Sequence, residues 1–169
     1  MKEIYERRSI RSYTGAKVPA EGMLKLCKAA MNAANGMATQ PWQIFVISDK
    51  ELIDELVRYN PGWIPLSKAG QGLLLCGDTD KNPNTGYLNI DLAASTQNVL
   101  LCAQSLGIGT CWLGVAPWED RVEAVKRLFR LPGNFHPVSM VACGYAADTG
   151  IAPNNRFLEE RIHYNAYTE

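Results

Sequence analysis

Apolar residues recur at helical spacing in four stretches of the chain. These stretches are residues 19–34, 50–59, 88–106 and 117–131. Pro19 and Pro117 lie in the first turn of their helices, where the missing N–H of proline does no harm. Ser48 or Asp49 can cap the second helix. Apolar side chains cover more than one face of the stretch 88–106, so we expect that helix to be buried on several sides.

Short apolar runs between these helices predict four strands, at residues 43–47, 73–76, 110–115 and 138–143. Because strands alternate with helices, we expect a sheet with helices on both faces. Residues 60–65 form an irregular apolar break, in which Trp63 lies either near the mouth of a cleft or against the core. The tail, residues 146–169, is polar with scattered apolar positions and lacks the pattern of an independent core element.

Length and composition indicate one globular domain of 169 residues. Its 17 basic residues balance 17 acidic ones, so no general attraction to nucleic acid or to an anionic membrane is expected. The five cysteines have neither the spacing of a disulfide framework nor that of a zinc site. The start of the chain lacks a signal-peptide pattern, and no apolar run reaches membrane-spanning length. We therefore expect a soluble, cytoplasmic protein.

The familiar motifs of hydrolases, phosphate-loop proteins and zinc proteases are absent from the sequence. Two histidines without a patterned set of further ligands make a poor metal site, so no metal is expected. The first positive feature is the run Arg7-Arg8-Ser9-Ile10-Arg11. Guanidinium groups form bidentate bonds to phosphate oxygens, so this run can hold a phosphate. The alternative is a solvated basic helix end.

Three further segments can each be interpreted either as part of a ligand site or as an ordinary structural segment. The loop from Asn35 to Trp42 offers amide side chains and exposed backbone to a planar heterocycle, or simply joins a helix to a strand. The segment from Gly107 to Gly114 brings backbone close to a ligand at a strand end, or packs in the core. Arg156 is a surface residue of the tail unless the tail returns to the N-terminal arginines.

Taken in order along the chain, these segments resemble the FMN-dependent nitroreductase family, in particular its short single-domain members. The segment RRSIRSYT is similar to the opening of the family, and ATQPWQIFV to its next loop and strand. DLAASTQNVLLCAQSLGIGTCWLGVAP resembles the central helix and the strand that faces the flavin. VACGYA and NNRFLEERIHYN resemble the late strand and the C-terminal arm.

The resemblance implies an α+β fold in which a mixed sheet is flanked by helices on both faces, in three layers. It also implies an intertwined homodimer with FMN at the subunit interface, and residues 146–169 as an arm packed on the partner subunit. NADH or NADPH would serve as co-substrate, and small electron-poor molecules such as nitroaromatics or quinones would be the acceptors.

The resemblance also implies roles for individual residues. Arg7, Arg8, Ser9 and Arg156 would hold the phosphate, and Arg11 would reach the pyrimidine side of the flavin. The loop that carries the remaining polar contacts would come from the partner subunit, and one strand would offer backbone near the flavin face. The residues of that loop and strand are Asn35, Gly36, Met37, Gln40, Leu113 and Gly114.

The chain departs from the family pattern at a few positions. Pro-Ser is common where this chain has Ala34-Asn35, asparagine is common in place of Ala38, and proline is common in place of Ala146. The amide of Asn35 can replace a serine hydrogen bond, whereas Ala38 cannot replace an asparagine side chain. These departures concern contacts with the flavin ring more than FMN binding itself.

The leading hypothesis is therefore ping-pong hydride transfer from NAD(P)H through FMN to an acceptor. The cofactor performs the difficult step, so no protein nucleophile or catalytic acid is assigned. One alternative keeps FMN but changes the reaction to reductive dehalogenation, for which this short chain lacks an insertion. Another is a flavin-binding redox sensor or FMN store without steady turnover. A third is an interaction domain without a cofactor.

Overall fold

The computed structural model describes residues 2–148 and 156–167. The longer helices are α2 (Ala20–Met31), α3 (Lys50–Tyr59), α4 (Ile64–Ala69), α5 (Thr85–Ser105) and α6 (Glu119–Phe129). The strands are β1 (Trp42–Ile47), β2 (Gly72–Asp78), β3 (Gly109–Gly114) and β4 (Phe135–Gly144). Short turns of helix complete the described elements: α1 (Glu3–Glu6), η1 (Gly36–Ala38), η2 (Pro61–Trp63) and η3 (Glu159–Arg161).

The four strands form one sheet in the order β1-β2-β4-β3, and every neighbouring pair is antiparallel. Leu74 in β2 lies opposite Phe45 in β1 and Met140 in β4, which places β2 at the centre of the pairing. Parallel pairing occurs as one isolated bridge, between Ser9 and Thr110 at the start of β3. The N-terminal segment thus extends the edge of the sheet.

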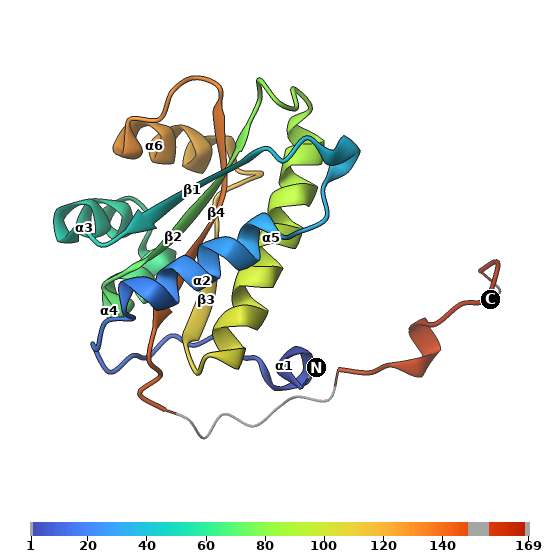
Figure 1. Ribbon diagram of the computed structural model, residues 1–169, viewed down its shortest axis with the longest axis horizontal. Coiled ribbons are helices and arrows are strands. Elements are labelled where there is room, and N and C mark those ends of the chain that lie inside the picture. The colour runs from blue at the N-terminus through green and yellow to red at the C-terminus, as the bar shows by residue number, and fades with distance from the viewer. Residues whose placement is uncertain (1, 149–155, 168–169) are drawn as a thin grey trace.

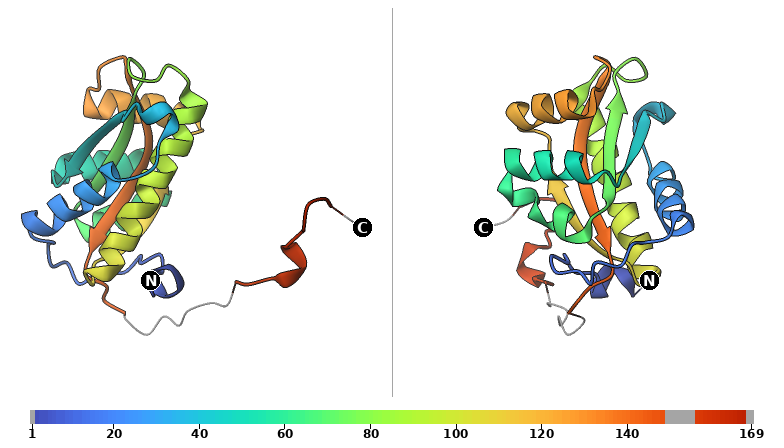
Figure 2. Two further views of the ribbon diagram at one scale, coloured as in Figure 1. Left: turned by 45° about the vertical axis from the view of Figure 1, so that its right-hand side comes forward. Right: turned by 90° about the vertical axis from the view of Figure 1, so that its left-hand side faces the viewer.

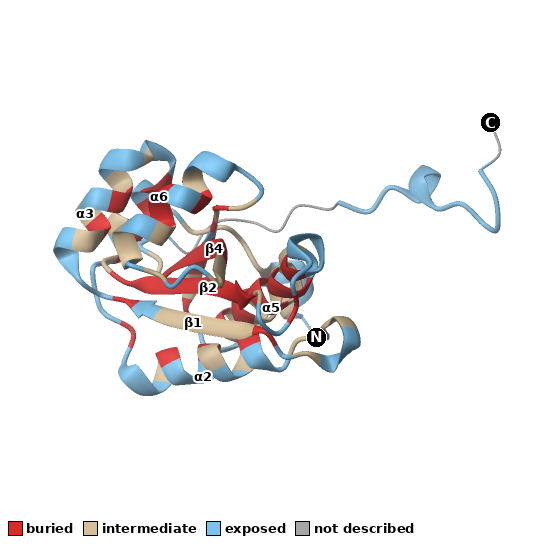
Figure 3. Cartoon of the chain, turned by 90° about the horizontal axis from the view of Figure 1, so that it is seen from above, coloured by how far each residue is buried: buried red, intermediate tan, exposed pale blue. Residues whose placement is uncertain are grey.

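Helices cover both faces of this sheet (Figures 1 and 2). Successive side chains of β2 point to opposite faces, so Leu73 and Leu75 pack toward α2 and α5, whereas Leu74 and Cys76 pack toward α3, α4 and α6. All four side chains are fully buried. Figure 3 shows the buried residues concentrated along β2, β4 and the inner side of α5. The predicted α+β fold with three layers is therefore confirmed, but its four named strands form an antiparallel sheet and not the mixed sheet that the resemblance implies.

Most sequence-predicted elements agree with the structure, with small shifts at their ends. The helix at residues 50–59 has the predicted bounds, and Oδ1 of Asp49 accepts a hydrogen bond from the backbone N–H of Leu52 at 2.7 Å. The long helix begins earlier than predicted because Asn84 caps it, with Oδ1 accepting from the N–H of Tyr87. The break predicted at residues 60–65 is wrong in part, since Pro65 lies in the first turn of α4.

The segment before α2 runs across one end of the sheet. The N–H of Ile10 donates to the carbonyl of Thr110 at 2.8 Å, and the N–H of Thr14 donates to that of Tyr145 at 2.9 Å. At the other end of the chain, every residue from 156 to 167 is exposed, and this arm extends away from the body (Figure 1). None of the described helices is long and apolar enough to cross a membrane.

Gly72 provides a test of this sheet packing. A methyl group there would overlap the carbonyl oxygen of Val141 in β4 and lie 2.7 Å from Cδ1 of Leu66 in α4. Because backbone cannot move as a side chain does, we expect Gly72→Ala to lower the free energy of unfolding by about 2–3 kcal/mol. Gly133→Ala is the matched control, since its methyl group would meet no atom within 4 Å. Equal unfolding free energies in urea for the two variants would contradict this packing.

Candidate active site

The run of N-terminal arginines lies along the edge of the sheet in extended conformation. Ser9 bridges to Thr110, and a β-carbon at Gly109 would lie 3.0 Å from Cγ1 of Ile10. Glycine at position 109 therefore allows the N-terminal segment to approach β3 closely. Alternate side chains of an extended segment point to opposite sides. The run consequently presents two different faces.

Arg7 and Arg11 lie on the face toward Cys111 in β3. Burial raises the pKa of the Cys111 thiol, and the positive charges of Arg11 and Arg7 oppose that rise. Burial also lowers the pKa of Arg7, as do the positive charges of Arg156 and Arg8. The charge of Arg156 thus acts on Arg7, and the predicted grouping of Arg156 with the N-terminal run stays a prediction. A bound anion would relieve the repulsion among these guanidinium groups.

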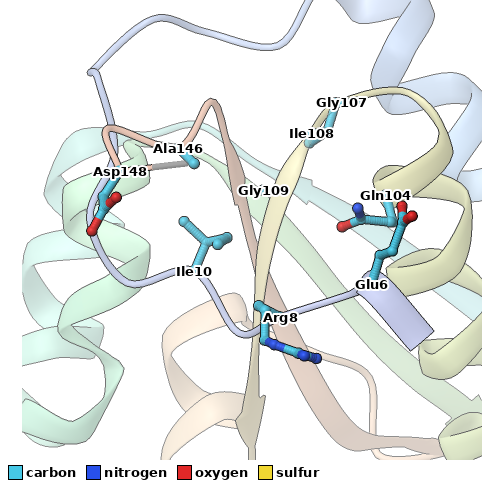
Figure 4. Close-up of a pocket in the computed structure, with 9 residues that line it drawn as sticks. All are labelled: Glu6, Arg8, Ile10, Gln104, Gly107, Ile108, Gly109, Ala146 and Asp148. Carbon is cyan, nitrogen blue, oxygen red and sulfur yellow. The ribbon is translucent and has the colours of Figure 1, made fainter. Parts of the chain in front are cut away.

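Arg8 belongs to the other face of the run. Its Nη1 donates to the carbonyl of Arg7 at 2.7 Å, and it lines a hollow of about 190 Å³ between the N-terminal segment, the end of α5 and the start of β3 (Figure 4). Glu6, Gln104 and Asp148 line the same hollow. Two carboxylates make this hollow a poor place for a phosphate. Arg7 and Arg8 therefore lie on different faces of the run, and their predicted grouping with Ser9 and Arg156 around a phosphate stays a prediction.

A second hollow, of about 180 Å³, lies beside β3 on the face of α3, α4 and α6. It gathers the sequence-predicted Arg11, Leu113 and Gly114 with residues of η2, α4 and α6. The complete lining is Arg11, Asn60, Gly62, Trp63, Pro65, Cys111, Trp112, Leu113, Gly114 and Arg121. The guanidinium of Arg11 is exposed, and its Nη1 lies 3.5 Å from the carbonyl oxygen of Ser9. The side chain of Leu113 is buried in the core.

Trp63 lines this hollow and also packs in the core. Its position therefore agrees with both alternatives considered from the sequence, near the mouth of a cleft or against the core. It is 2% exposed, and its ring lies beside that of Tyr59 at 6.0 Å between centroids. Nε1 of Trp63 donates to the carbonyl of Gly114 at 3.3 Å. The same carbonyl accepts from Nη1 of Arg121 at 3.2 Å. The end of β3 is therefore fixed by two side-chain donors.

The predicted loop from Asn35 to Gln40 lies at the opposite end of α5. Oδ1 of Asn35 accepts from the N–H of Gln40 at 2.9 Å, which closes the loop on itself. Met37, Ala38 and Gln40 have φ of 55°, 53° and 46°. Each of these left-handed conformations costs a non-glycine residue about 1 kcal/mol. Such strain is typical of functional segments held by their surroundings.

Asp91 of α5 holds this loop, and the sequence reasoning missed it. Its side chain is 4% exposed, and Oδ1 accepts from the N–H of Gly36 at 2.9 Å. Gly36 also lies against the ring of Tyr87, where a β-carbon would be 3.1 Å from Cδ1. The available signal was a carboxylate in the middle of a helix predicted to be apolar on several sides, because such a group needs a partner when buried. Arg121 was missed because a lone helix arginine carries no pattern.

The two parts of the predicted site do not meet within one chain (Figure 1). Asp91 contacts the loop, whereas Gln104, which follows it by 13 residues on the same helix, contacts the hollow of the N-terminal run. At 1.5 Å per residue these positions are about 20 Å apart. Each hollow is also smaller than the roughly 300–1,000 Å³ usual for small-molecule sites.

Asp91→Ala tests the contact that holds the loop. The variant removes the acceptor of the Gly36 N–H, so we expect amide hydrogen exchange at residues 36–40 to accelerate about five- to tenfold. Asp91→Asn keeps an oxygen at that position and is the matched control, with exchange close to that of the unmodified chain. Unchanged exchange in Asp91→Ala would show that other contacts hold the loop.

Comparison with known proteins identifies similar chains. A model of the nitroreductase family matches residues 4–86 and 78–145. A curated relative from Archaeoglobus fulgidus, named "Putative NADH dehydrogenase/NAD(P)H nitroreductase", is 36% identical over 96% of this chain and 95% of its own length. A crystal structure of a protein of that name from Parabacteroides distasonis has a TM-score of 0.93 and 32% identity, covering 98% of this chain and 97% of the other. A structure from Desulfovibrio desulfuricans, described as a nitroreductase in complex with FMN, has a TM-score of 0.83 and 26% identity, covering 99% and 96%.

Proposed function

The chain belongs to the nitroreductase family, and from that premise we propose that it is an FMN-dependent oxidoreductase that uses NADH or NADPH. One observation carries the proposal beyond family membership. Arg7 and Arg156 lie 149 positions apart in the sequence, and the positive charge of Arg156 adds to burial in lowering the pKa of Arg7. A cluster of like charges of this kind fits the phosphate of FMN, which would neutralise it.

Each group of residues has a distinct task in this proposal. Arg7, Arg156 and the hydroxyl of Ser9 bind the phosphate. Arg11 lies beside the hollow at β3 and binds the pyrimidine side of the flavin, where a cation stabilises the negative charge of the reduced cofactor. Leu113 and Gly114 supply backbone near the ring. When bound, FMN supplies ping-pong hydride transfer from NAD(P)H to an electron-poor acceptor such as a nitroaromatic or a quinone.

The loop from Asn35 to Gln40 completes the site from a partner subunit. In an isologous dimer with antiparallel α5 helices, the loop end of one helix lies beside the arginine end of the other. Residues on the outward side of α5 recur every three or four positions. Tyr87 and Ile90 belong to this set, and they are 49% and 67% exposed. Packing of two α5 helices through this stripe would bury that apolar surface and bridge the separation of about 20 Å.

The arm at the C-terminus fits the same arrangement. Its described residues, 156–167, are all exposed, and Tyr164 and Tyr167 are 83% and 74% exposed. Exposed aromatic residues gathered on one short segment are typical of a surface that another protein covers. We assign that role to the partner subunit, so that residues 156–167 wrap the second copy, whereas Ala146 and Ala147 pair with the N-terminal segment of their own chain.

The proposal is tested by anaerobic mixing of the FMN-loaded protein with NADH or NADPH. We expect flavin absorbance to bleach rapidly with at least one nicotinamide and to recover when a quinone is added. Arg7→Ala should weaken FMN binding about 10- to 100-fold, because a charge-assisted hydrogen bond is lost. Arg11→Ala should retain FMN but slow its bleaching. Arg58→Ala, on the exposed side of α3, is the control and should match the unmodified protein.

Two results would overturn parts of this account. A flavin that neither nicotinamide reduces would indicate an FMN store or sensor in place of an enzyme. Identical behaviour of the three arginine variants would show that the N-terminal run does not hold the cofactor.

A further inference from the structure

The hollow beside β3 contains a second cation that the proposed function leaves unassigned. Arg121 lies in the first turn of α6 and lines this hollow together with Arg11. Its guanidinium carbon lies 4.1 Å from the centroid of the Trp118 ring. Its Nη1 donates to the carbonyl of Gly114 at 3.2 Å. Two contacts therefore fix the direction in which this charge points.

Arg121 forms no ion pair with an acidic side chain in the described part of the chain. The ion pairs formed among those residues involve Lys25, Lys50 and Lys126 as the cations. Asp120, the neighbour of Arg121, accepts a hydrogen bond from the hydroxyl of Tyr59 at 3.1 Å and does not line the hollow. Glu119 is exposed at the start of α6 and does not line it either. The hollow thus combines two cations with no carboxylate in its lining.

The guanidinium of Arg121 is arranged to receive an anion. It has five N–H donors in a planar fork, and the carbonyl of Gly114 uses one nitrogen. Stacking on Trp118 orders the side chain before any ligand arrives, so little rotamer entropy remains to be lost on binding. Gly114 permits this stacking, because a β-carbon there would lie 3.0 Å from Cζ3 of Trp118.

We propose that Arg121 determines acceptor specificity by binding a carboxylate carried by an aromatic electron acceptor. The inference rests on the proposed function, in which Arg11 is occupied by the flavin and Arg121 remains for the second substrate. The indole ring of Trp118 is 49% exposed beside Arg121 and supplies apolar surface for an aromatic ring. Aromatic acceptors with a carboxylate are therefore preferred over neutral analogues of the same shape.

The test compares 4-nitrobenzoate with 4-nitrobenzamide, which differ mainly in charge. In Arg121→Gln, we expect kcat/KM for 4-nitrobenzoate to fall about 10- to 100-fold, mostly through KM, and that for 4-nitrobenzamide to change less than threefold. Calorimetric titration of the FMN-loaded protein with benzoate should show a similar loss of affinity. Arg121→Lys should recover part of the preference, because it keeps the charge but loses the fork. Arg127→Gln, exposed on the same helix, is the control.

Several outcomes would overturn this assignment. One is an equal fall for both acceptors, which would indicate damage to the site as a whole. A second is an unchanged preference for 4-nitrobenzoate. A third is a rise in KM for NADPH but not NADH with acceptors unaffected, which would assign Arg121 to the 2′-phosphate of the nucleotide. If neither nicotinamide reduces the flavin of the unmodified protein, the proposed function fails, and benzoate binding still tests Arg121 separately.

Discussion

The packing of α5 against the centre of the sheet fixes the positions of both parts of the candidate site. Leu92, Val99 and Ala103 on its inner side are fully buried. Two buried hydroxyls add directional contacts: Oγ of Ser95 donates to the carbonyl of Ala30 at 2.9 Å, and Oγ1 of Thr96 lies 2.7 Å from Oγ of Ser139. Because buried polar groups are costly without partners, these bonds specify the rotation of the helix as well as its depth. The loop and the N-terminal run then lie at its opposite ends.

This arrangement explains why the two parts of the candidate site are separate within one chain. The N-terminal run carries several arginines at the edge of β3, and burial and like charges lower the pKa of Arg7. The loop held by Asp91 keeps strained backbone exposed at the far end of the same helix. A rigid helix between them does not let them meet in one subunit, whereas a two-fold axis brings opposite ends together. The proposed dimer would therefore be required to complete the site.

Local patterns in the sequence were sufficient for much of the fold. The helix at residues 50–59 was predictable because its cap, its apolar spacing and its end all lie within a few residues. The helix α4 was not, because two prolines and a glycine around Trp63 indicate a break, and tertiary packing of Leu66 and Ala69 overrides that signal.

The candidate site divides in the same way. Arg7, Arg11 and the loop from Asn35 were proposed from the sequence because several segments matched a family pattern in order. Asp91 and Arg121 act through contacts with residues 55 and seven positions away, respectively, and only the fold reveals these partners. The separation of Arg8 from Arg7 likewise depends on the extended conformation that pairing with β3 imposes.

The central claim, that each FMN site is built from two chains, is tested most directly by subunit mixing. Arg7→Ala damages the N-terminal part of the site, and the double variant Asn35→Ala/Gln40→Ala damages the loop part. Hybrid dimers with one subunit of each kind, isolated through two different affinity tags, contain one doubly damaged site and one intact site if the sites are shared. We predict two flavin-poor parental dimers and a hybrid that binds one FMN per dimer with the affinity of the unmodified protein. A hybrid as flavin-poor as its parents would show that each site lies within a single chain.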